Sequence, residues 1–199
     1  MVIASGNAGK VREFARLLAD WGLDISPMPP HLEVEETGAT FAENARIKGV
    51  TVAVATGCWA LADDSGLEVR ALGGAPGVHS ARYAPTDGAR IERLLGELSA
   101  VEQNAGTGEG PPDRGARFVA ALALADPQGR VVVEVEGVCE GTILREPLGE
   151  GGFGYDPVFW VEEAGQSFAQ MDPAVKAQFS HRGRAFQALQ PLLLHHWSR

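Results

Sequence analysis

The chain has few cysteines and few basic residues, and both shortages exclude classes of protein. Its two cysteines among 199 residues, Cys58 and Cys139, form no CxxC or Cys/His pattern, so we expect no zinc site and a reducing compartment, the cytoplasm. Seventeen Lys and Arg stand against 26 Asp and Glu, and the resulting net charge of −9 disfavours partners such as DNA, RNA or an anionic membrane. We find no internal repeat and no apolar stretch long enough to cross a bilayer, and we expect no signal peptide. An enzyme that acts on small molecules fits these limits.

The length allows a single domain whose core needs no disulfide, and we expect residues 1–199 to form it. Strand-like runs at 117–125 and 130–138 are joined by Asp126-Pro127-Gln128-Gly129, which predicts a hairpin. A helix is expected at 91–98, followed by a surface loop at 103–114 that is rich in Gly and Pro. A last helix is expected at 184–195, with Phe186, Leu189 and Leu193 on one stripe.

The N-terminal segment has the pattern of a phosphate-binding turn. The short apolar run at 2–4 is followed by Ser5-Gly6-Asn7-Ala8-Gly9-Lys10 and then by a helix with one apolar stripe, Val11, Phe14, Leu17, Leu18 and Trp21. Glycines let the backbone approach an anion, a helix start offers N–H groups, and Lys10 adds a charge. The turn is not a common P-loop, since Val11 stands where a Ser or Thr would hold magnesium, so any metal must be held elsewhere. The alternative is a plain connection between strand and helix.

Two adjacent carboxylates, Asp63 and Asp64, follow a short apolar run. The run Trp59–Ala62 is expected to be a strand that ends at Asp63-Asp64-Ser65-Gly66. Ligands of open α/β sheets bind beyond the carboxyl ends of strands, which makes this a candidate site. Because side chains alternate along a strand, only one of Asp63 and Asp64 can face a given site squarely. An Asx-type turn is the alternative.

A second acidic cluster, Glu33-Val34-Glu35-Glu36, precedes a predicted helix. Thr40 and Glu43 form a capping box that fixes the helix start near Phe41. Asn44 and Lys48 then share one helix face. Glu35, Glu36 and Asp64 could together offer the hard oxygen ligands that Mg²⁺ prefers, with nucleotide phosphates and waters completing the shell. The alternative is a solvated acidic surface.

Taken together, these motifs resemble those of the inosine triphosphate pyrophosphatases, also called non-canonical purine nucleoside triphosphate pyrophosphatases. The resemblance covers nearly the whole chain and is carried by an ordered set of motifs: Ser5–Lys10, Glu35-Glu36-Thr37-Gly38, Phe41, Glu43-Asn44-Ala45, Lys48, Ala62–Leu67, Leu72–Val78, Ser80–Tyr83, Gly151–Pro157 and Ser180–Gly183. Each motif alone is weakly specific, whereas the ordered set is strongly specific.

The resemblance implies an elongated, two-lobed α/β fold with a central mixed β-sheet flanked by helices, an active-site cleft between the lobes and a homodimer. It implies hydrolysis of dITP, ITP and XTP to the nucleoside monophosphate and pyrophosphate, which keeps these nucleotides out of DNA and RNA. The cofactor would be Mg²⁺, with Mn²⁺ as a possible substitute. Asp64 would be the general base, and Glu35 or Glu36 would hold the metal with it. The implied substrate-binding residues are Ser5, Gly6, Asn7, Ala8, Gly9, Lys10, Lys48, Ser65, Phe153, Gly154, Tyr155, Asp156, Lys176, His181 and Arg182.

The physical chemistry of the residues agrees with that reaction. Attack on an α-phosphorus requires positive charge on the leaving pyrophosphate and a positioned water, and Lys10, Lys48 and the metal would supply the charge. A carboxylate such as Asp64 can orient or deprotonate the water. We find no confident nucleophile for a covalent intermediate, so direct hydrolysis is the simpler hypothesis.

Selection of the purine depends on the C-terminal third. Hypoxanthine and xanthine carry a 6-keto acceptor where adenine carries an amino donor, so a site lined with donors would reject ATP. His181 and Arg182, at the start of a helix expected to be capped by Ser180, are suitable donors. Phe153 and Tyr155 could stack on the base, although we expect at least one of them to pack in the core instead.

Two rival functions remain open at this stage. A triphosphate sensor would need the phosphate turn but not the carboxylates at Glu35, Glu36 and Asp64. An interaction protein would leave Asp63-Asp64 after an apolar run, and His181-Arg182 at a helix start, without an explanation. Both are therefore less favoured than the enzyme.

Overall fold

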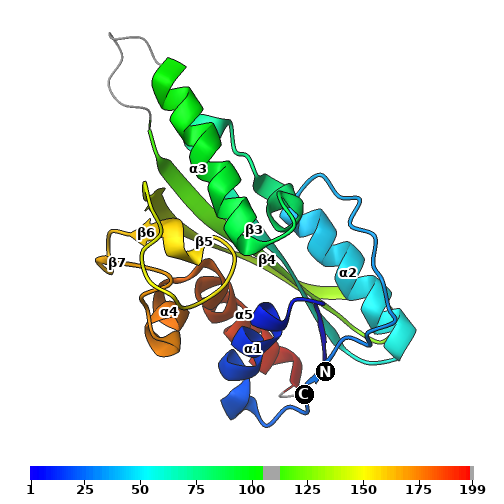
Figure 1. The fold of residues 1–199 in the computed structure, drawn as a ribbon. Helices are drawn as coiled ribbons and strands as arrows, with labels where there is room; N and C mark the ends of the chain where they lie inside the picture. The colour runs from blue at the N-terminus through cyan, green and yellow to red at the C-terminus, as the bar shows by residue number, and fades with distance from the viewer. Residues whose placement is uncertain (105–112, 198–199) are drawn as a thin grey trace. The chain divides into compact units, whose positions relative to one another are not determined.

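The computed structural model, which describes residues 1–104 and 113–197, shows an α/β protein with one mixed, seven-stranded sheet (Figure 1). The strand order is β2-β1-β3-β4-β5-β6-β7. β1 is parallel to β2 and to β3, whereas β6 is antiparallel to β5 and to β7. The strands are β1 (Val2–Ala4), β2 (Ser26–Pro27), β3 (Ala60–Val69), β4 (Gly115–Ala125), β5 (Val131–Ile143), β6 (Phe159–Val161) and β7 (Gln166–Ser167). The predicted fold class, a mixed sheet flanked by helices, is confirmed.

Five α-helices and four short 3-10 helices are described. The α-helices are α1 (Ala8–Leu17), α2 (Phe41–Thr56), α3 (Asp87–Asn104), α4 (Pro173–Phe179) and α5 (His181–Trp197). The 3-10 helices are η1 (Ala19–Trp21), η2 (Arg70–Leu72), η3 (Gly77–Arg82) and η4 (Asp156–Val158). Among the described residues, no helix combines the length and the apolar character needed to cross a membrane.

The chain divides into two compact units. Unit 1 comprises Met1–Ser65, Ala120–Gly137 and His181–Arg199. Unit 2 comprises Gly66–Val119 and Val138–Ser180. The phosphate turn and both acidic clusters of the sequence belong to unit 1, whereas the segment around Phe153 and Lys176 belongs to unit 2.

Unit 1 has a helix layer on each face of its strands, and the alternation of side chains explains why. Ile3 and Leu61 pack in one core cluster with residues of α1 and α5, among them Phe14 and Phe186. Their strand neighbours Val2, Ala4, Ala60 and Ala62 pack in a second cluster with Val52 and Ala53 of α2. Successive strand residues thus reach opposite layers, as the period of two requires. Ala4 pairs with Ala62, so the turn that begins at Ser5 lies beside Asp63.

Local sequence signals place α2. The predicted capping box is confirmed: Thr40 accepts the N–H of Glu43, and the Glu43 carboxylate accepts the N–H of Thr40. The helix ends at Gly57, whose φ of 64° lies in the left-handed region. A Cβ at Gly49 would lie 3.4 Å from the carbonyl oxygen of Ala123, so α2 packs closely on the sheet.

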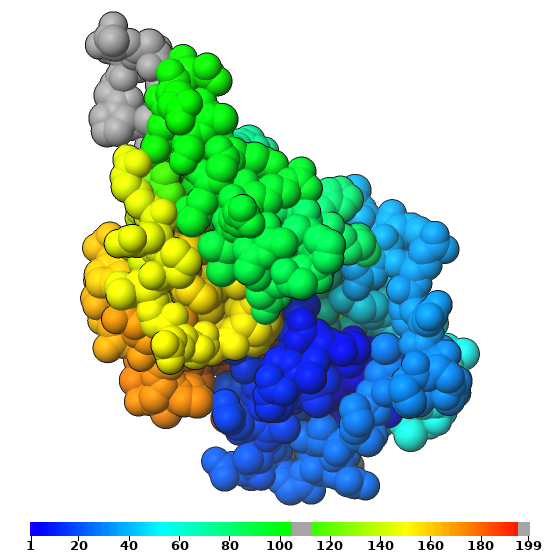
Figure 2. All heavy atoms as spheres, viewed as in Figure 1, coloured from blue at the N-terminus to red at the C-terminus, as the bar shows by residue number. Residues whose placement is uncertain are grey.

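Unit 2 is built around one apolar cluster that contains Leu94 and Leu98 of α3. Phe118, Phe159 and Phe168 form an aromatic group in it, with ring centroids 4.7 to 5.7 Å apart. The outer side of α3 is exposed and forms the green ridge in the space-filling view (Figure 2). The predicted helix at 91–98 exists but is longer, since α3 runs from Asp87 to Asn104.

The predicted hairpin is confirmed, and both of its strands are longer than expected. Its turn is closed by the N–H of Asp126, which donates to the carbonyl of Arg130, and by the Asp126 carboxylate, which accepts the N–H of Arg130. The last helix is also confirmed, with Phe186, Leu189 and Leu193 buried. The predicted loop at 103–114 was wrong at its start, which belongs to α3, and its residues 105–112 lie outside the described ranges.

Candidate active site

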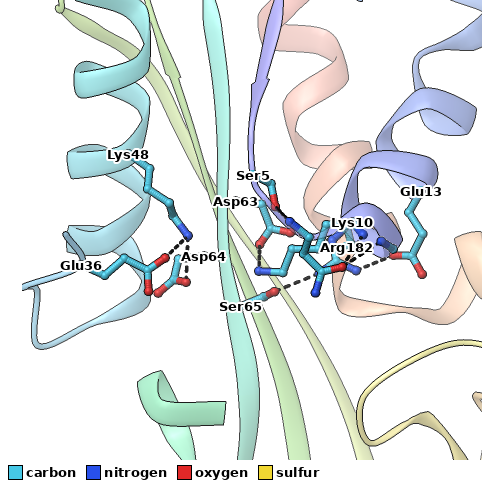
Figure 3. A network of polar contacts seen from close by, with 11 residues as sticks. Ser5, Lys10, Glu13, Glu36, Lys48, Asp63, Asp64, Ser65 and Arg182 are labelled. Atoms are coloured by element: carbon cyan, nitrogen blue, oxygen red, sulfur yellow. Dashed lines mark hydrogen bonds and ion pairs between the residues drawn. The ribbon is translucent and has the colours of Figure 1, made fainter. Parts of the chain in front are cut away.

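Asp63 and Asp64 lie inside β3, and their side chains point to opposite sides of the strand (Figure 3). The prediction that the strand ends before them was wrong, because β3 runs on to Val69 and forms no turn at Ser65. The expected alternation is confirmed, since Asp63 meets residues of α1 and α5 and Asp64 meets a residue of α2. Both carboxylates are buried, and the strand can hold them because cations from other elements compensate their charge.

Arg182 is the main partner of Asp63 and is only 1% exposed. Its Nε donates to Asp63 Oδ2 at 2.6 Å, its Nη2 donates to Ser65 Oγ at 2.9 Å, and its Nη1 donates to Glu13 Oε2. The guanidinium fork therefore joins α5 to β3 and to α1 (Figure 3). Sequence reasoning assigned Arg182 to the base of a substrate, whereas in this structure each of its three nitrogens donates to a group of unit 1.

Lys10 is the second cation at Asp63, with its Nζ 3.4 Å from Asp63 Oδ1. Burial alone would raise the pKa of Asp63, but the charges of Arg182 and Lys10 outweigh it and hold that pKa well below its usual range. Burial also lowers the pKa of Lys10, and the charge of Asp63 opposes this shift. Asp63 is therefore ionised at neutral pH and links the N-terminal turn to α5 through Lys10 and Arg182.

The N-terminal turn is organised by Asn7, which caps α1. Asn7 Oδ1 accepts the N–H of Gly9 at 2.8 Å and that of Lys10 at 3.2 Å, and Ser5 Oγ accepts the N–H of Asn7. Three amides of the predicted phosphate-binding turn, those of Asn7, Gly9 and Lys10, are thus already hydrogen-bonded within the turn. Gly6 is exposed, and a Cβ there would meet nothing within 4 Å. The backbone at Gly6 is therefore open to close approach by an anion. Ala8, the remaining predicted residue, begins α1.

Lys48 of α2 forms ion pairs with two carboxylates, those of Glu36 and Asp64. Its Nζ lies 2.7 Å from Glu36 Oε1 and 3.1 Å from Asp64 Oδ1 (Figure 3). Burial raises the pKa of Asp64, and the charge of Lys48 offsets this only in part. Burial would lower the pKa of Lys48, but Asp64 and Glu36 together raise it. The ammonium of Lys48 is thus shared by the carboxylates of Glu36 and Asp64. Of these two, Asp64 has a raised pKa and takes up a proton more readily than an ordinary aspartate.

The carboxylates of Glu36 and Asp64 fit a hard divalent cation. Asp64 Oδ2 is buried and has no hydrogen-bond partner among the described residues, which is unusual for a carboxylate oxygen. Of the two predicted glutamates, Glu36 lies beside Asp64, whereas Glu35 is exposed. Within residues 1–104 and 113–197 no group of three or more His, Cys, Asp or Glu side chains could hold a metal. A cation here would thus need further oxygens from a ligand and water, which is the usual habit of Mg²⁺.

Asp156 and Lys176 form a buried ion pair in unit 2. Lys176 Nζ donates to Asp156 Oδ2 at 2.7 Å, and the same oxygen accepts the N–H of Phe153 at 2.8 Å. The Lys176 ammonium also lies over the ring of Phe153, 4.9 Å from its centroid. A Cβ at Gly152 would lie 2.0 Å from Asp156 Oδ2, so the chain folds tightly over this pair.

Tyr155 packs in the core of unit 2, and its hydroxyl donates to the carbonyl of Ser80 at 2.9 Å. The expectation that at least one of the two aromatic rings is a core residue is thereby confirmed. Phe153 is half-buried, and the N–H of Gly154 donates to Asp87 at 2.7 Å. His181, the first residue of α5, is buried in unit 1.

Two contributors to these networks were not identified from sequence. Glu13 accepts from Arg182, and the signal that could have found it is its place one helical turn after Lys10, on the same helix face. Asn44 was noticed only as a neighbour of Lys48, although it is fully buried and accepts the N–H of Gly38. Its burial depends on the packing of unit 1, so no sequence signal could have identified its role.

Comparison with known proteins agrees with the motifs. A family model described as the Ham1 family matches residues 1–192. A dITP/XTP pyrophosphatase of Parasynechococcus marenigrum is 58% identical over 97% of this chain and 94% of its own length. The structure of a HAM1 protein from Coxiella burnetii is 41% identical, with a TM-score of 0.83 over 98% of each chain. A nucleoside-triphosphatase / dITP/XTP pyrophosphatase from Mycobacterium abscessus is 42% identical, with a TM-score of 0.70 over 96% of this chain and 98% of its own.

Proposed function

The chain belongs to the Ham1 family, and we propose that it hydrolyses non-canonical purine nucleoside triphosphates, namely dITP, ITP and XTP, to the nucleoside monophosphate and pyrophosphate. Such a hydrolase removes these nucleotides before they enter DNA or RNA. The observation that carries the proposal is the buried Lys48 between the carboxylates of Glu36 and Asp64. It occurs in a chain that is 58% identical to a relative named dITP/XTP pyrophosphatase.

Glu36 and Asp64 are the residues that would hold Mg²⁺, or Mn²⁺ in its place. The unpartnered Asp64 Oδ2 and the proximity of the two carboxylates support this choice over one that includes Glu35. When bound, the metal supplies positive charge against the triphosphate. Without the metal, the ammonium of Lys48 keeps the carboxylates of Glu36 and Asp64 close together, because two neighbouring like charges would otherwise repel each other.

The triphosphate binds at the N-terminal turn, Ser5 to Lys10, in this proposal. Gly6 offers open backbone, and Lys10 and the first turn of α1 offer positive charge. Lys10 Nζ lies 3.4 Å from Asp63, a longer contact than that of Arg182 with the same carboxylate at 2.6 Å. Lys10 is thus the cation at Asp63 that can turn towards a phosphate, since Arg182 by itself keeps Asp63 paired.

Asp64 is the proposed general base. Its raised pKa improves its ability to accept a proton from an attacking water at neutral pH, compared with an ordinary aspartate. Asp63 cannot take that role, because Arg182 and Lys10 keep its pKa low. In this proposal Asp64 accepts the proton, whereas Asp63 stays ionised and binds Arg182 and Lys10.

The remaining predicted contacts concern the ribose and the base, and they stay proposals. Ser65, His181 and Arg182 belong to unit 1, and Phe153, Gly154, Tyr155, Asp156 and Lys176 belong to unit 2. Asp156 and Lys176 offer charged groups beside the half-buried ring of Phe153, which supports a role in selecting a keto-purine. We propose further that the protein is a cytoplasmic homodimer that binds neither nucleic acid nor membrane.

The direct test is pyrophosphate release by the purified protein. ITP and XTP are compared with ATP and GTP in the presence of Mg²⁺, and a chelated sample gives the metal-free control. We expect Mg²⁺-dependent release of pyrophosphate from ITP and XTP only. Release of orthophosphate would indicate a phosphatase, and tight binding of ITP without release would indicate a sensor, so either result would overturn the proposal.

A further inference from the structure

Asn44 is a fully buried polar residue to which the proposed reaction gives no role. It lies in α2, one helical turn before Lys48. Its Oδ1 accepts the N–H of Gly38 at 2.8 Å, whereas its Nδ2 has no hydrogen-bond partner among the described residues. An apolar residue of similar size would avoid the unpaired donor. The acceptor oxygen is therefore the part of Asn44 that this position requires.

The loop before α2 is hydrogen-bonded to side chains of the helix at three consecutive residues, 38 to 40. The N–H of Gly38 donates to Asn44, and the N–H groups of Ala39 and Thr40 both donate to Glu43 Oε2. The contact at Gly38 is very close, since a Cβ there would lie 2.6 Å from Glu43 Cβ and 2.7 Å from Asn44 Oδ1. Position 38 thus suits glycine because the loop backbone lies directly against the helix.

These hydrogen bonds between the loop and α2 limit the positions that Glu36 can occupy. Glu36 precedes Gly38 by two residues, and two residues of extended chain reach about 7 Å at most. The Glu36 carboxylate lies 2.7 Å from Lys48 Nζ, which also contacts Asp64. A shift of Gly38 away from α2 would therefore carry Glu36 away from its partners.

We infer that Asn44 is a positioning residue, which holds Gly38 through its side-chain oxygen and thereby places the Glu36 carboxylate beside Lys48 and Asp64. The inference rests on the proposed function, because it assigns Glu36 to the metal. Asn44 itself touches no reacting group in this assignment. It acts through the loop.

Two substitutions disturb the contact from its two sides. Asn44→Ala removes the acceptor, and Gly38→Ala forces the loop away while leaving Asn44 in place. For both variants we expect kcat with ITP, and the affinity for Mn²⁺ in the presence of nucleotide product, to fall about 10- to 100-fold, the usual effect of losing an outer-shell partner. Asn44→Asp keeps an acceptor oxygen. Burial raises the pKa of the new carboxyl group and favours its neutral form, so the hydrogen bond to Gly38 persists and kcat should stay within about 3-fold of the unsubstituted enzyme. Gly96→Ala is the matched control, because position 96 is exposed on α3 and its Cβ would meet nothing within 4 Å.

A double-mutant cycle with Glu36→Gln separates positioning from mere support of the fold. If Asn44 acts through Glu36, Asn44→Ala should change kcat by less than about 2-fold once Glu36 is replaced. Independent effects, in which the two losses multiply, would overturn the inference. Gly38→Ala provides the same cycle if Asn44→Ala does not fold.

A readout without turnover distinguishes this inference from the proposed function. Amide hydrogen exchange at Gly38, followed by NMR in the full chain, should be at least about 10-fold faster in Asn44→Ala and unchanged in Asn44→Asp. Unchanged protection in Asn44→Ala would overturn the inference even in an active enzyme. Absence of hydrolysis by the unsubstituted protein would instead overturn the proposed function, while the exchange data still report on Gly38.

Discussion

Asp63 and Asp64 are neighbours in the sequence, yet Arg182 holds the first at 2.6 Å and Lys48 holds the second at 3.1 Å, on opposite sides of β3. Their pKa values move in opposite directions. Arg182 and Lys10 outweigh the effect of burial and lower the pKa of Asp63, whereas burial outweighs Lys48 and raises the pKa of Asp64. Strand geometry points the two side chains to opposite sides, and the different cations on the two sides make them chemically different carboxylates.

Asp64→Asn should reduce kcat with ITP by at least about 1,000-fold, because an amide can neither accept the proton of water nor serve as a charged metal ligand. The fold should survive, since Lys48 keeps Glu36 as a partner. Steady-state kinetics and a thermal unfolding curve measure the two effects. Glu92→Gln, an exposed change on α3, is the control. A near-normal rate in Asp64→Asn would remove this residue from the chemistry.

Glu35 and Glu36 form a matched pair of tests, because they are adjacent and only Glu36 reaches Lys48. Glu36→Gln should raise the Mg²⁺ concentration for half-maximal activity about 10-fold or more, the scale expected when one carboxylate ligand is lost. Glu35→Gln should leave it within about 2-fold. A Mg²⁺ titration at saturating ITP gives both values. The reverse order of effects would show that the loop adopts another arrangement during catalysis.

Lys10→Ala should weaken binding of the triphosphate more than it slows the chemical step. We expect KM for ITP to rise about 10- to 100-fold, since one charged contact to phosphate is worth about 1.5–3 kcal/mol. Arg182 remains at Asp63, so the fold should persist. Lys10→Arg serves as the comparison that keeps the charge. An unchanged KM for Lys10→Ala would exclude the N-terminal turn from substrate binding.

Asp63 should make stability depend on pH in acid. Its folded pKa lies well below the ordinary value of 3.8, so on acidification the unfolded chain is protonated first. The stability that Asp63 contributes is therefore present above about pH 5 and is lost as the pH falls towards the folded pKa. Asp63→Asn should cost about 3–5 kcal/mol at neutral pH, because it leaves Arg182 without its main buried partner.

Urea unfolding at several pH values tests the sign of this effect. Between pH 5 and pH 3 the difference in unfolding free energy between the unsubstituted protein and Asp63→Asn should shrink by about 1 kcal/mol. The shift at Asp64 has the opposite sign, but it is common to both proteins and cancels in the difference. A difference that stays constant over this range would show that Asp63 has an ordinary pKa in the folded protein.

The sequence was most informative where the cause of a structure is local. The capping box at Thr40 and Glu43 and the hairpin turn at 126–129 involve residues a few positions apart, and both were predicted correctly. The motifs that predicted the family also led to the Lys48, Glu36 and Asp64 set, although sequence alone did not choose between Glu35 and Glu36. The exposure of Glu35 and the contact of Glu36 with Lys48 now favour Glu36.

Prediction failed where the cause is distant in the sequence. Two adjacent aspartates ordinarily indicate the end of a strand, and β3 continues through them because their cations come from α1, α2 and α5. Arg182 lies 119 residues from Asp63 in the sequence, so no local sequence pattern predicts their ion pair. The hydrogen bond from the N–H of Gly38 to Asn44 was also missed. Asn44 is buried only when the whole of unit 1 packs, and a local sequence pattern does not reveal that burial.

The assignment of residues to the two units has a consequence for the order of events during biosynthesis. Unit 2 ends at Ser180, whereas unit 1 contains α5, which follows Ser180, as well as β1. Every residue of unit 2 has therefore been synthesised before Arg182 can reach Asp63. Until then, Asp63 and Glu13 lack their shared guanidinium, and a nascent chain that stops at position 180 carries Lys48, Glu36 and Asp64 without the element that completes their unit.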